Sequence, residues 1–240
     1  MEHAMNIAMS PDALDGSLDS ETIIYHELSH MWFGDWVTCK TANEMWINEG
    51  WASYCEAIFT EHMYGNTQFK NYVRINHDKV LKSAHINDGD FYAVANVPLD
   101  QTYGTTSYDK GADRVHTLRG YLGDEIFYAC VKEYLIQLAD SSITSAEMRD
   151  VFTAVSGIDM TDFFDGWIYS PGFPQFSVDS YAVSSFGEGF SVGLQMRQRL
   201  RAQNNFANSN RIEVTFIDAD WNMETHLVEF DGERETVSLE

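Results

Sequence analysis

Two histidines four residues apart carry the clearest chemical signal in this sequence of 240 residues, because His26-Glu27-Leu28-Ser29-His30 has the spacing H-E-x-x-H. On a helix, residues i and i+4 lie on one face, so both imidazoles can reach a single metal ion. Glu27 is rotated by about 100° from His26, which puts its carboxylate beside the ion. The pattern predicts a metal site in which Glu27 is the general base that takes a proton from a metal-bound water.

A third ligand is required, because a mononuclear catalytic zinc ion takes three protein ligands and keeps one position open. Eighteen residues separate His30 from Glu49, where a second helical pattern begins. Two antiparallel helices joined by a short connection would bring Glu49 back to the histidines. Glu44 is the nearby alternative, but it lies in the connection, where we expect a solvated side chain. Glu56 lies on the same helical face as Glu49, and it either orients a ligand histidine or forms an ordinary salt bridge.

The donor set also indicates which metal the site would hold. Two imidazoles and one carboxylate suit Zn²⁺, and we expect one zinc ion per chain, although cobalt or manganese can replace zinc in vitro. The neighbouring aromatic residues Trp32, Phe33, Trp46 and Trp51 are expected to pack in the core rather than to contact substrate.

The elements that must position these residues are mainly helical before Pro174 and β-type after it. Periodicity predicts helices over residues 20–37, 46–62, 69–83, 108–121 and 124–138. Thr144-x-x-Glu147 resembles a capping box, and Gly157 fits a C-terminal helix cap. Residues 84–106 are expected to form a long surface loop, and loops of that length are often functional.

Alternating apolar and polar residues follow Pro174 in four runs separated by turn signals. The runs span residues 176–183, 190–196, 212–216 and 227–230. The sequence therefore predicts an α+β fold in which a mainly helical domain is followed by a small antiparallel β-sandwich.

Composition restricts the functions that the chain can have. With 37 acidic and 15 basic side chains, the formal net charge is −22, which disfavours binding to nucleic acid or to an anionic membrane. We expect no membrane span, because no apolar run reaches about 18 residues, and no signal peptide at the start of the chain. The three cysteines, Cys39, Cys55 and Cys130, form no C-x-x-C pair and leave the compartment open, cytoplasmic or exported.

Longer stretches around the motif carry a family resemblance. These are His30-Met31-Trp32-Phe33-Gly34-Asp35, Trp46-Ile47-Asn48-Glu49-Gly50-Trp51-Ala52-Ser53-Tyr54, Ser107-Tyr108-Asp109-Lys110-Gly111-Ala112 and Phe163-Phe164-Asp165-Gly166-Trp167. Together with His26-Glu27-x-x-His30 and Glu49, they resemble the gluzincin metallopeptidases, and the aminopeptidase N family in particular. Met1-Glu2-His3-Ala4-Met5-Asn6 is similar to the end of that family's exopeptidase motif, Gly-x-Met-Glu-Asn, with His3 in place of Asn.

The resemblance implies a thermolysin-like zinc peptidase catalytic domain over residues 1–172 and a β-sandwich domain over residues 173–240. It implies a zinc-dependent aminopeptidase that acts on peptides with a free N-terminus. In that family Tyr108 would stabilise the oxyanion, with Tyr103 as the alternative donor, and Glu2 would bind the α-ammonium group of the substrate.

The resemblance also implies further domains in a longer parent protein, because members of the family carry a large N-terminal β domain and many carry a C-terminal helical domain. The chain starts inside the exopeptidase motif, so activity of this segment by itself is not implied. Two other functions stay open. One is a related gluzincin reaction, endopeptidase or epoxide hydrolase, and the other is an idle zinc-site scaffold whose β module binds a partner.

Overall fold

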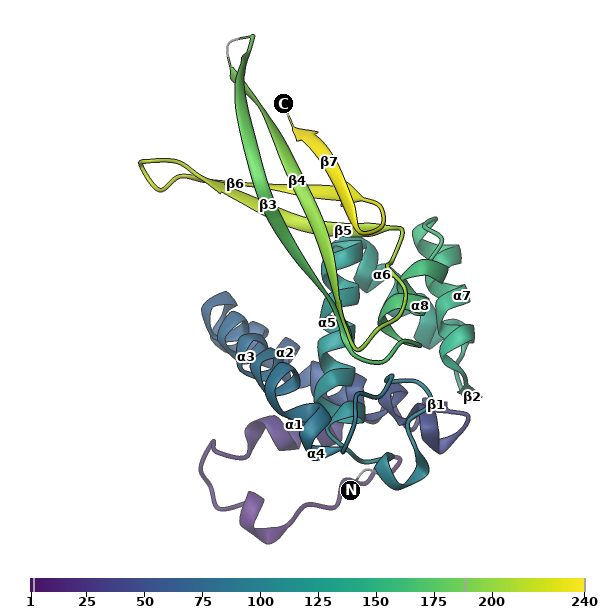
Figure 1. Cartoon of the computed structure of the whole chain (residues 1–240). Helices are drawn as coiled ribbons and strands as arrows, with labels where there is room; N and C mark the ends of the chain where they lie inside the picture. The colour runs from purple at the N-terminus through teal and green to yellow at the C-terminus, as the bar shows by residue number, and fades with distance from the viewer. Residues whose placement is uncertain (2, 188, 240) are drawn as a thin grey trace. The chain divides into compact units, whose positions relative to one another are not determined.

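The computed structural model describes residues 1, 3–187 and 189–239, which divide into two compact units, Met1–Met160 and Thr161–Glu240. The mixed helix and sheet content confirms the α+β class (Figure 1). The domain boundary predicted at residues 172/173 coincides with the start of the first long strand, whereas the division into compact units assigns the preceding short helix to the second unit.

The first unit is built mainly from helices. They are α1 (Glu21–Ser29), α2 (Glu49–Tyr64), α3 (Asn66–Lys79), α4 (His85–Asn87), α5 (Gly111–Leu122), α6 (Asp124–Gln137) and α7 (Ser145–Ser156). Short 3-10 turns occur at Pro11–Ala13, Ala42–Ile47 and Leu99–Gln101, and π-helical segments at Val80–Ala84 and Thr106–Lys110. Two short strands, β1 (Val37–Cys39) and β2 (Ser141–Ile143), pair in parallel. The sequence patterns did not predict this pair.

The first helix is shorter than predicted, because α1 ends at Ser29 rather than continuing to residue 37. The chain turns through Gly34, whose φ of +144° is a backbone conformation that favours glycine. The Gly34 N–H donates to the Val37 carbonyl at 2.8 Å, and Val37 begins β1. The turn therefore leads from the two histidines directly into a strand.

Stacked aromatic rings hold α2 in the centre of the first unit. Trp51, two residues after Glu49, is 1% exposed and stacks on Phe33 at a centroid distance of 4.8 Å. The ring centroids of Phe127 and Tyr134 lie 6.0 and 6.1 Å from that of Trp51. Phe33, Trp46 and Trp51 are thus in the core as expected, but the prediction was wrong for Trp32, which is 48% exposed.

The segment 84–106 is less of a surface loop than predicted. It begins with helical turns, and Val94, Ala95 and Val97 within it are at most 2% exposed. Asp88 accepts hydrogen bonds from the backbone N–H groups of Thr105 and Thr106 at 2.9 and 2.7 Å. The segment is therefore anchored in the first unit, and its far end is tied down directly before Tyr108.

Helices α2 and α5 approach closely where two glycines meet. A Cβ atom added at Gly111 would lie 2.7 Å from the Cα atom of Gly50, closer than real Cβ contacts allow. Gly50 follows Glu49 on α2, and Gly111 lies three residues after Tyr108. This glycine pair sets the distance between the helix that carries Glu49 and the segment that carries Tyr108.

We expect Gly111→Ala to destabilise the protein by about 1–3 kcal/mol, because the methyl group must push two packed backbones apart. Gly120→Ala is the matched control: it lies on the same helix, and a Cβ there meets nothing within 4 Å. Since alanine favours a helix over glycine, the control should be neutral or more stable by up to about 1 kcal/mol. Denaturant unfolding measures both, and equal effects at the two positions would contradict the close-contact argument.

The second unit contains α8 (Thr161–Trp167) and five strands, β3 (Phe173–Phe186), β4 (Gly189–Arg201), β5 (Asn210–Ile217), β6 (Met223–Phe230) and β7 (Arg234–Leu239). Antiparallel β3, β4 and β7 form one sheet, and the antiparallel β5–β6 hairpin forms another, which crosses the first in Figure 1. Leu194, Met196, Val228 and Phe230 form the core between the sheets. Four strands match the predicted runs, whereas β7 was not predicted.

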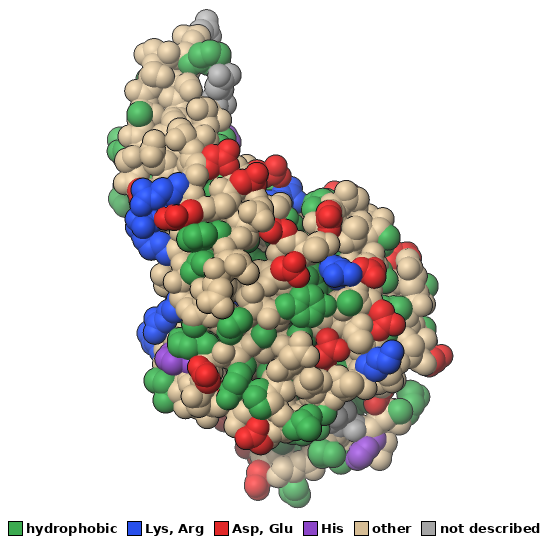
Figure 2. Space-filling view, turned by 45° about the vertical axis from the view of Figure 1, so that its right-hand side comes forward, with side chains coloured by type: hydrophobic (Ala, Val, Ile, Leu, Met, Phe, Trp, Pro, Cys, Tyr) green, Lys and Arg blue, Asp and Glu red, His purple; other side chains and the backbone are tan. Residues whose placement is uncertain are grey.

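Surface charge follows the composition. On the face shown in Figure 2, acidic side chains are scattered among polar and apolar surface, and basic side chains occur in small separate groups. A broad basic surface is thus absent from the residues drawn there. Within the described parts of the chain, every helix is too short or too polar to cross a membrane.

Candidate metal centre

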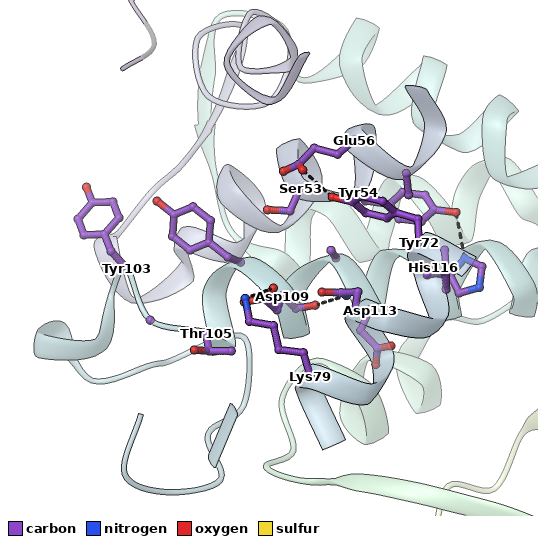
Figure 3. Close-up of a pocket in the computed structure, with 16 residues that line it drawn as sticks. Ser53, Tyr54, Glu56, Tyr72, Lys79, Tyr103, Thr105, Asp109, Asp113 and His116 are labelled. Atoms are coloured by element: carbon purple, nitrogen blue, oxygen red, sulfur yellow. Dashed lines mark hydrogen bonds and ion pairs between the residues drawn. The ribbon is translucent and has the colours of Figure 1, made fainter. Parts of the chain in front are cut away.

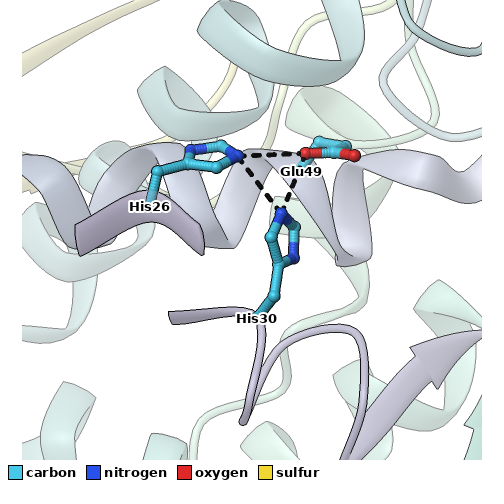
Figure 4. Close-up of side chains that lie close together, drawn as sticks. All are labelled: His26, His30 and Glu49. Atoms are coloured by element: carbon cyan, nitrogen blue, oxygen red, sulfur yellow. Dashed lines mark hydrogen bonds and ion pairs between the residues drawn. The ribbon is translucent and has the colours of Figure 1, made fainter. Parts of the chain in front are cut away.

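Three buried side chains from α1 and α2 meet at one point in the first unit (Figure 4). The Nε2 atom of His26 lies 3.2 Å from the Nε2 atom of His30 and 3.2 Å from the Oε2 atom of Glu49. The Nε2 atom of His30 lies 3.3 Å from the same carboxylate oxygen. All three residues are at most 9% exposed, so three donor atoms converge in a place sheltered from bulk water.

The spacing of these donors fits a tetrahedral ion. Two ligand atoms that each bind zinc at about 2.05 Å, at tetrahedral angles, lie about 3.3 Å apart. The separations of 3.2, 3.2 and 3.3 Å are close to this value for all three pairs. Two imidazole nitrogens and one carboxylate oxygen are also the donor types that zinc takes in catalytic sites with one open position. The site therefore fits a zinc ion in both geometry and chemistry.

The second nitrogen of each ring is already engaged. Nδ1 of His26 lies 2.9 Å from Oε1 of Glu56, and Nδ1 of His30 lies 2.8 Å from the carbonyl oxygen of Phe33. Both partners accept hydrogen bonds from Nδ1, so in the neutral form of each ring the proton lies on Nδ1 and the lone pair of Nε2 faces the common point, as a metal ligand requires. A Cβ at Gly34 would lie 3.1 Å from Nδ1 of His30, so the glycine also leaves room for this ring.

Burial and hydrogen bonds shift the pKa values of His26 and Glu49 in opposite directions. Burial lowers the pKa of His26, but hydrogen bonds to Glu49 and Glu56 outweigh burial and raise this pKa to about 9. Burial raises the pKa of Glu49, but hydrogen bonds from His26 and His30 outweigh burial and lower this pKa to about 2. The carboxylate is therefore ionised at neutral pH, ready to bind a cation.

Glu27 follows His26 on α1 and is not one of the three converging residues. Its side chain is 16% exposed, and Oε2 lies 2.9 Å from the amino group of Met1. The carboxylate of Glu27 therefore lies beside the three converging side chains rather than among them.

Tyr108 lies next to the ligand cluster, in the π-helical segment Thr106–Lys110 that precedes α5. Its ring stacks near that of His26, with centroids 6.0 Å apart and planes at 10°. It also lines a cavity of about 540 Å³ between α2, α3 and α5 (Figure 3). Tyr103 lines the same cavity but is 67% exposed, so the structure brings Tyr108, rather than Tyr103, against the ring of His26.

The prediction that Glu44 is solvated was wrong, because the residue is only 8% exposed. Its Oε1 atom accepts a hydrogen bond of 2.9 Å from the backbone N–H of Ser145, the first residue of α7. A carboxylate at a helix N-terminus is stabilised by the unpaired N–H groups and the helix dipole. Glu44 thus caps a helix and lies outside the group of three converging side chains.

Two further residues, Glu2 and Glu56, were predicted to belong to the site. Glu2 lies outside the described residues. Glu56 lies on α2 and bonds the ring of His26, while its second oxygen accepts a hydrogen bond from Tyr72 on α3. Tyr72 was missed by the sequence analysis, and no local signal reveals it, because its contact depends on how two helices pack.

Comparison with known proteins identifies the family. Residues 4–167 match the family model described as the peptidase family M1 domain. The chain is 28% identical over 183 residues to a leucyl aminopeptidase of Saccharolobus solfataricus, which covers 71% of this chain and 22% of that protein. It is 24% identical over 240 residues to a probable aminopeptidase of Sulfurisphaera tokodaii, covering 98% and 28%. A leukotriene A-4 hydrolase of Xenopus laevis is 28% identical over 186 residues, covering 72% and 30%.

Solved structures share the fold. A crystal structure of Legionella pneumophila aminopeptidase A in complex with aspartic acid matches with a TM-score of 0.69 at 18% identity, covering 93% of this chain and 24% of that chain. An M1 zinc metallopeptidase from Deinococcus radiodurans matches with a TM-score of 0.56 at 19% identity, covering 63% and 33%. The chain spans less than a third of the length of the curated relatives named above. Because the family match covers well over half of the chain, the chain belongs to peptidase family M1.

Proposed function

We propose that this chain carries the zinc site of an aminopeptidase that removes the N-terminal residue from peptides. The observation that carries the proposal is the convergence of His26, His30 and Glu49 at tetrahedral spacing. Membership of family M1 and the printed names of two relatives, both aminopeptidases, support the same reaction. The partners we propose are peptides with a free N-terminus and further domains of a longer parent protein.

In this proposal His26, His30 and Glu49 hold one zinc ion per chain. A zinc ion bound there would acidify a water and polarise the scissile carbonyl group. Glu27, beside the ligands, takes the proton from the attacking water and passes it to the leaving amine. Glu27 follows His26 directly on α1, so its carboxylate lies on the part of the helix that also carries the two histidines.

Tyr108 has the position of an oxyanion donor in the proposal. Its phenol belongs to the segment directly before α5, and its ring lies beside His26. A hydrogen bond from a phenol to the developing oxyanion is strongest in the transition state, which makes it a catalytic contact. Glu2 is proposed to bind the α-ammonium group of the substrate, on the resemblance of Met1-Glu2-His3-Ala4 to the exopeptidase motif.

A pair of substrates tests the exopeptidase reaction. We expect the anilide of a free amino acid to be hydrolysed, and its N-acetylated copy to be hydrolysed at least about 10-fold more slowly. The reason is that an acetylated amine cannot form a charge-assisted hydrogen bond worth roughly 1.5–3 kcal/mol. The measurement is kcat/KM for both substrates, with this chain and, in parallel, with any longer polypeptide that contains it.

The control for this test is an internal peptide bond in a substrate blocked at both ends. Cleavage of the blocked peptide as fast as the free anilide would indicate an endopeptidase. Equal hydrolysis of the free and acetylated anilides would refute the aminopeptidase. Hydrolysis of an epoxide without either peptidase activity would favour the epoxide hydrolase reaction instead.

A further inference from the structure

The hydroxyl group of Tyr72 contacts Glu56, which in turn contacts the ring of His26. Glu56 lies two helical turns after Glu49 on α2, and its side chain is 17% exposed. One of its oxygens lies 2.9 Å from Nδ1 of His26, and the other accepts a hydrogen bond of 2.5 Å from the hydroxyl group of Tyr72 (Figure 3). A continuous set of hydrogen bonds thus runs from α3 to a metal ligand on α1.

The phenol can act only as the donor in this contact. Burial, together with the charge of Glu56 and the hydrogen bond to it, raises the pKa of Tyr72. The hydroxyl group therefore stays protonated at neutral pH, and the carboxylate accepts from Tyr72 on one side and from His26 on the other. Both oxygens of Glu56 are fixed by partners on different helices.

The side chain of Glu56 has room to move if its hydrogen bond from Tyr72 is lost. It lines the cavity of about 540 Å³ between α2, α3 and α5, together with Tyr72. A glutamate side chain has several rotatable bonds, and a carboxylate released from one partner gains free energy by turning toward water. Without the hydroxyl group, the carboxylate would spend part of its time in the cavity and away from His26.

We infer that Tyr72 is a positioning residue for the metal site, which acts by holding Glu56 against His26. This inference rests on the proposed function, because it requires zinc to bind at His26, His30 and Glu49. Partners of ligand histidines raise metal affinity by fixing the ring and its tautomer, and their loss typically costs about 10–100-fold in affinity. Tyr72 acts one contact further from the metal, so its loss belongs at the lower end of that range.

The test is the zinc affinity of Tyr72→Phe, measured by competition with a chromogenic chelator. We expect zinc to bind about 10-fold more weakly than in the parent chain, and to dissociate faster. Tyr54→Phe is the matched control, since it removes another phenol that lines the same cavity. The Tyr54 hydroxyl group contacts His116 and Arg119 rather than Glu56, so this variant should keep the parent affinity.

A second variant separates positioning from a general loss of stability. In a Glu56→Gln background, Tyr72→Phe should lower zinc affinity by less than about 2-fold, because the residue through which it acts is altered already. Parent affinity in Tyr72→Phe, the same weakening in Tyr54→Phe, or a full 10-fold loss in the Glu56→Gln background would each overturn the inference. A parent chain that binds no zinc would overturn the proposed metal site itself, which distinguishes the two failures.

Discussion

Glu27→Gln is expected to bind zinc like the parent chain and to lose hydrolysis by a factor of about 10² to 10⁴. The amide keeps the size of the carboxylate and its ability to hydrogen-bond, but it cannot take a proton from water. Glu27 lies beside the three converging residues, so the ligand set is unchanged by the substitution. The measurement is kcat with a free amino-acid anilide, alongside zinc content by metal analysis.

The matched control is Glu125→Gln, which removes a carboxylate from the exposed start of α6 and should leave both readouts unchanged. The experiment requires an active parent polypeptide, this chain or a longer one that contains it. Near-normal turnover by Glu27→Gln with full zinc content would show that another group activates the water. Loss of zinc together with activity would show that Glu27 supports the ligands instead.

Local spacing made much of the site predictable. In any helix, residues four positions apart lie on one face, and the structure accordingly brings the Nε2 atoms of His26 and His30 to 3.2 Å from each other. Glu49 required one further step, that a short connection returns the chain to the first helix. Both steps use geometry over a short stretch of sequence, although the sequence left Glu44 open as the alternative to Glu49.

Contacts between helices were not predictable in the same way. Tyr72 reaches Glu56 only because α3 packs on α2 in one register, and Glu44 is buried only because α7 starts beside it. The residue types in the sequence allowed either carboxylate a solvated position. The residues around Glu44 in the sequence do not show that the N-terminus of α7, about a hundred residues later, lies beside its carboxylate.

The fold shows the same division between local and distant causes. The capping box at Thr144 and the C-terminal cap at Gly157 are present, because their signals lie within one turn of the helix end. The parallel pairing of β1 with β2 joins segments that are about a hundred residues apart. Aromatic residues after His30 continue the apolar period, so the helix end before Gly34 was not recognised.

Glu49→Ala is expected to reduce bound zinc from about one equivalent to a small fraction of that. The two remaining imidazoles cannot complete a three-ligand site, so binding should weaken by about 3 kcal/mol or more, which is at least about 10²-fold. Glu49→Gln is the variant of conserved size, which guards against a loss of folding. It also removes the negative charge, so it should weaken zinc binding as well. Metal analysis and chelator competition give the result.

Glu44→Ala tests whether Glu44, five residues before Glu49, is a metal ligand or a structural carboxylate. It leaves the N–H of Ser145 unpaired at the buried start of α7, which should cost about 1–3 kcal/mol of unfolding free energy. Zinc content should stay at the parent level, because Glu44 is not among the converging donors. The two substitutions therefore act on different readouts. Full zinc retention in Glu49→Ala, with loss in Glu44→Ala, would reverse the assignment and make Glu44 the third ligand.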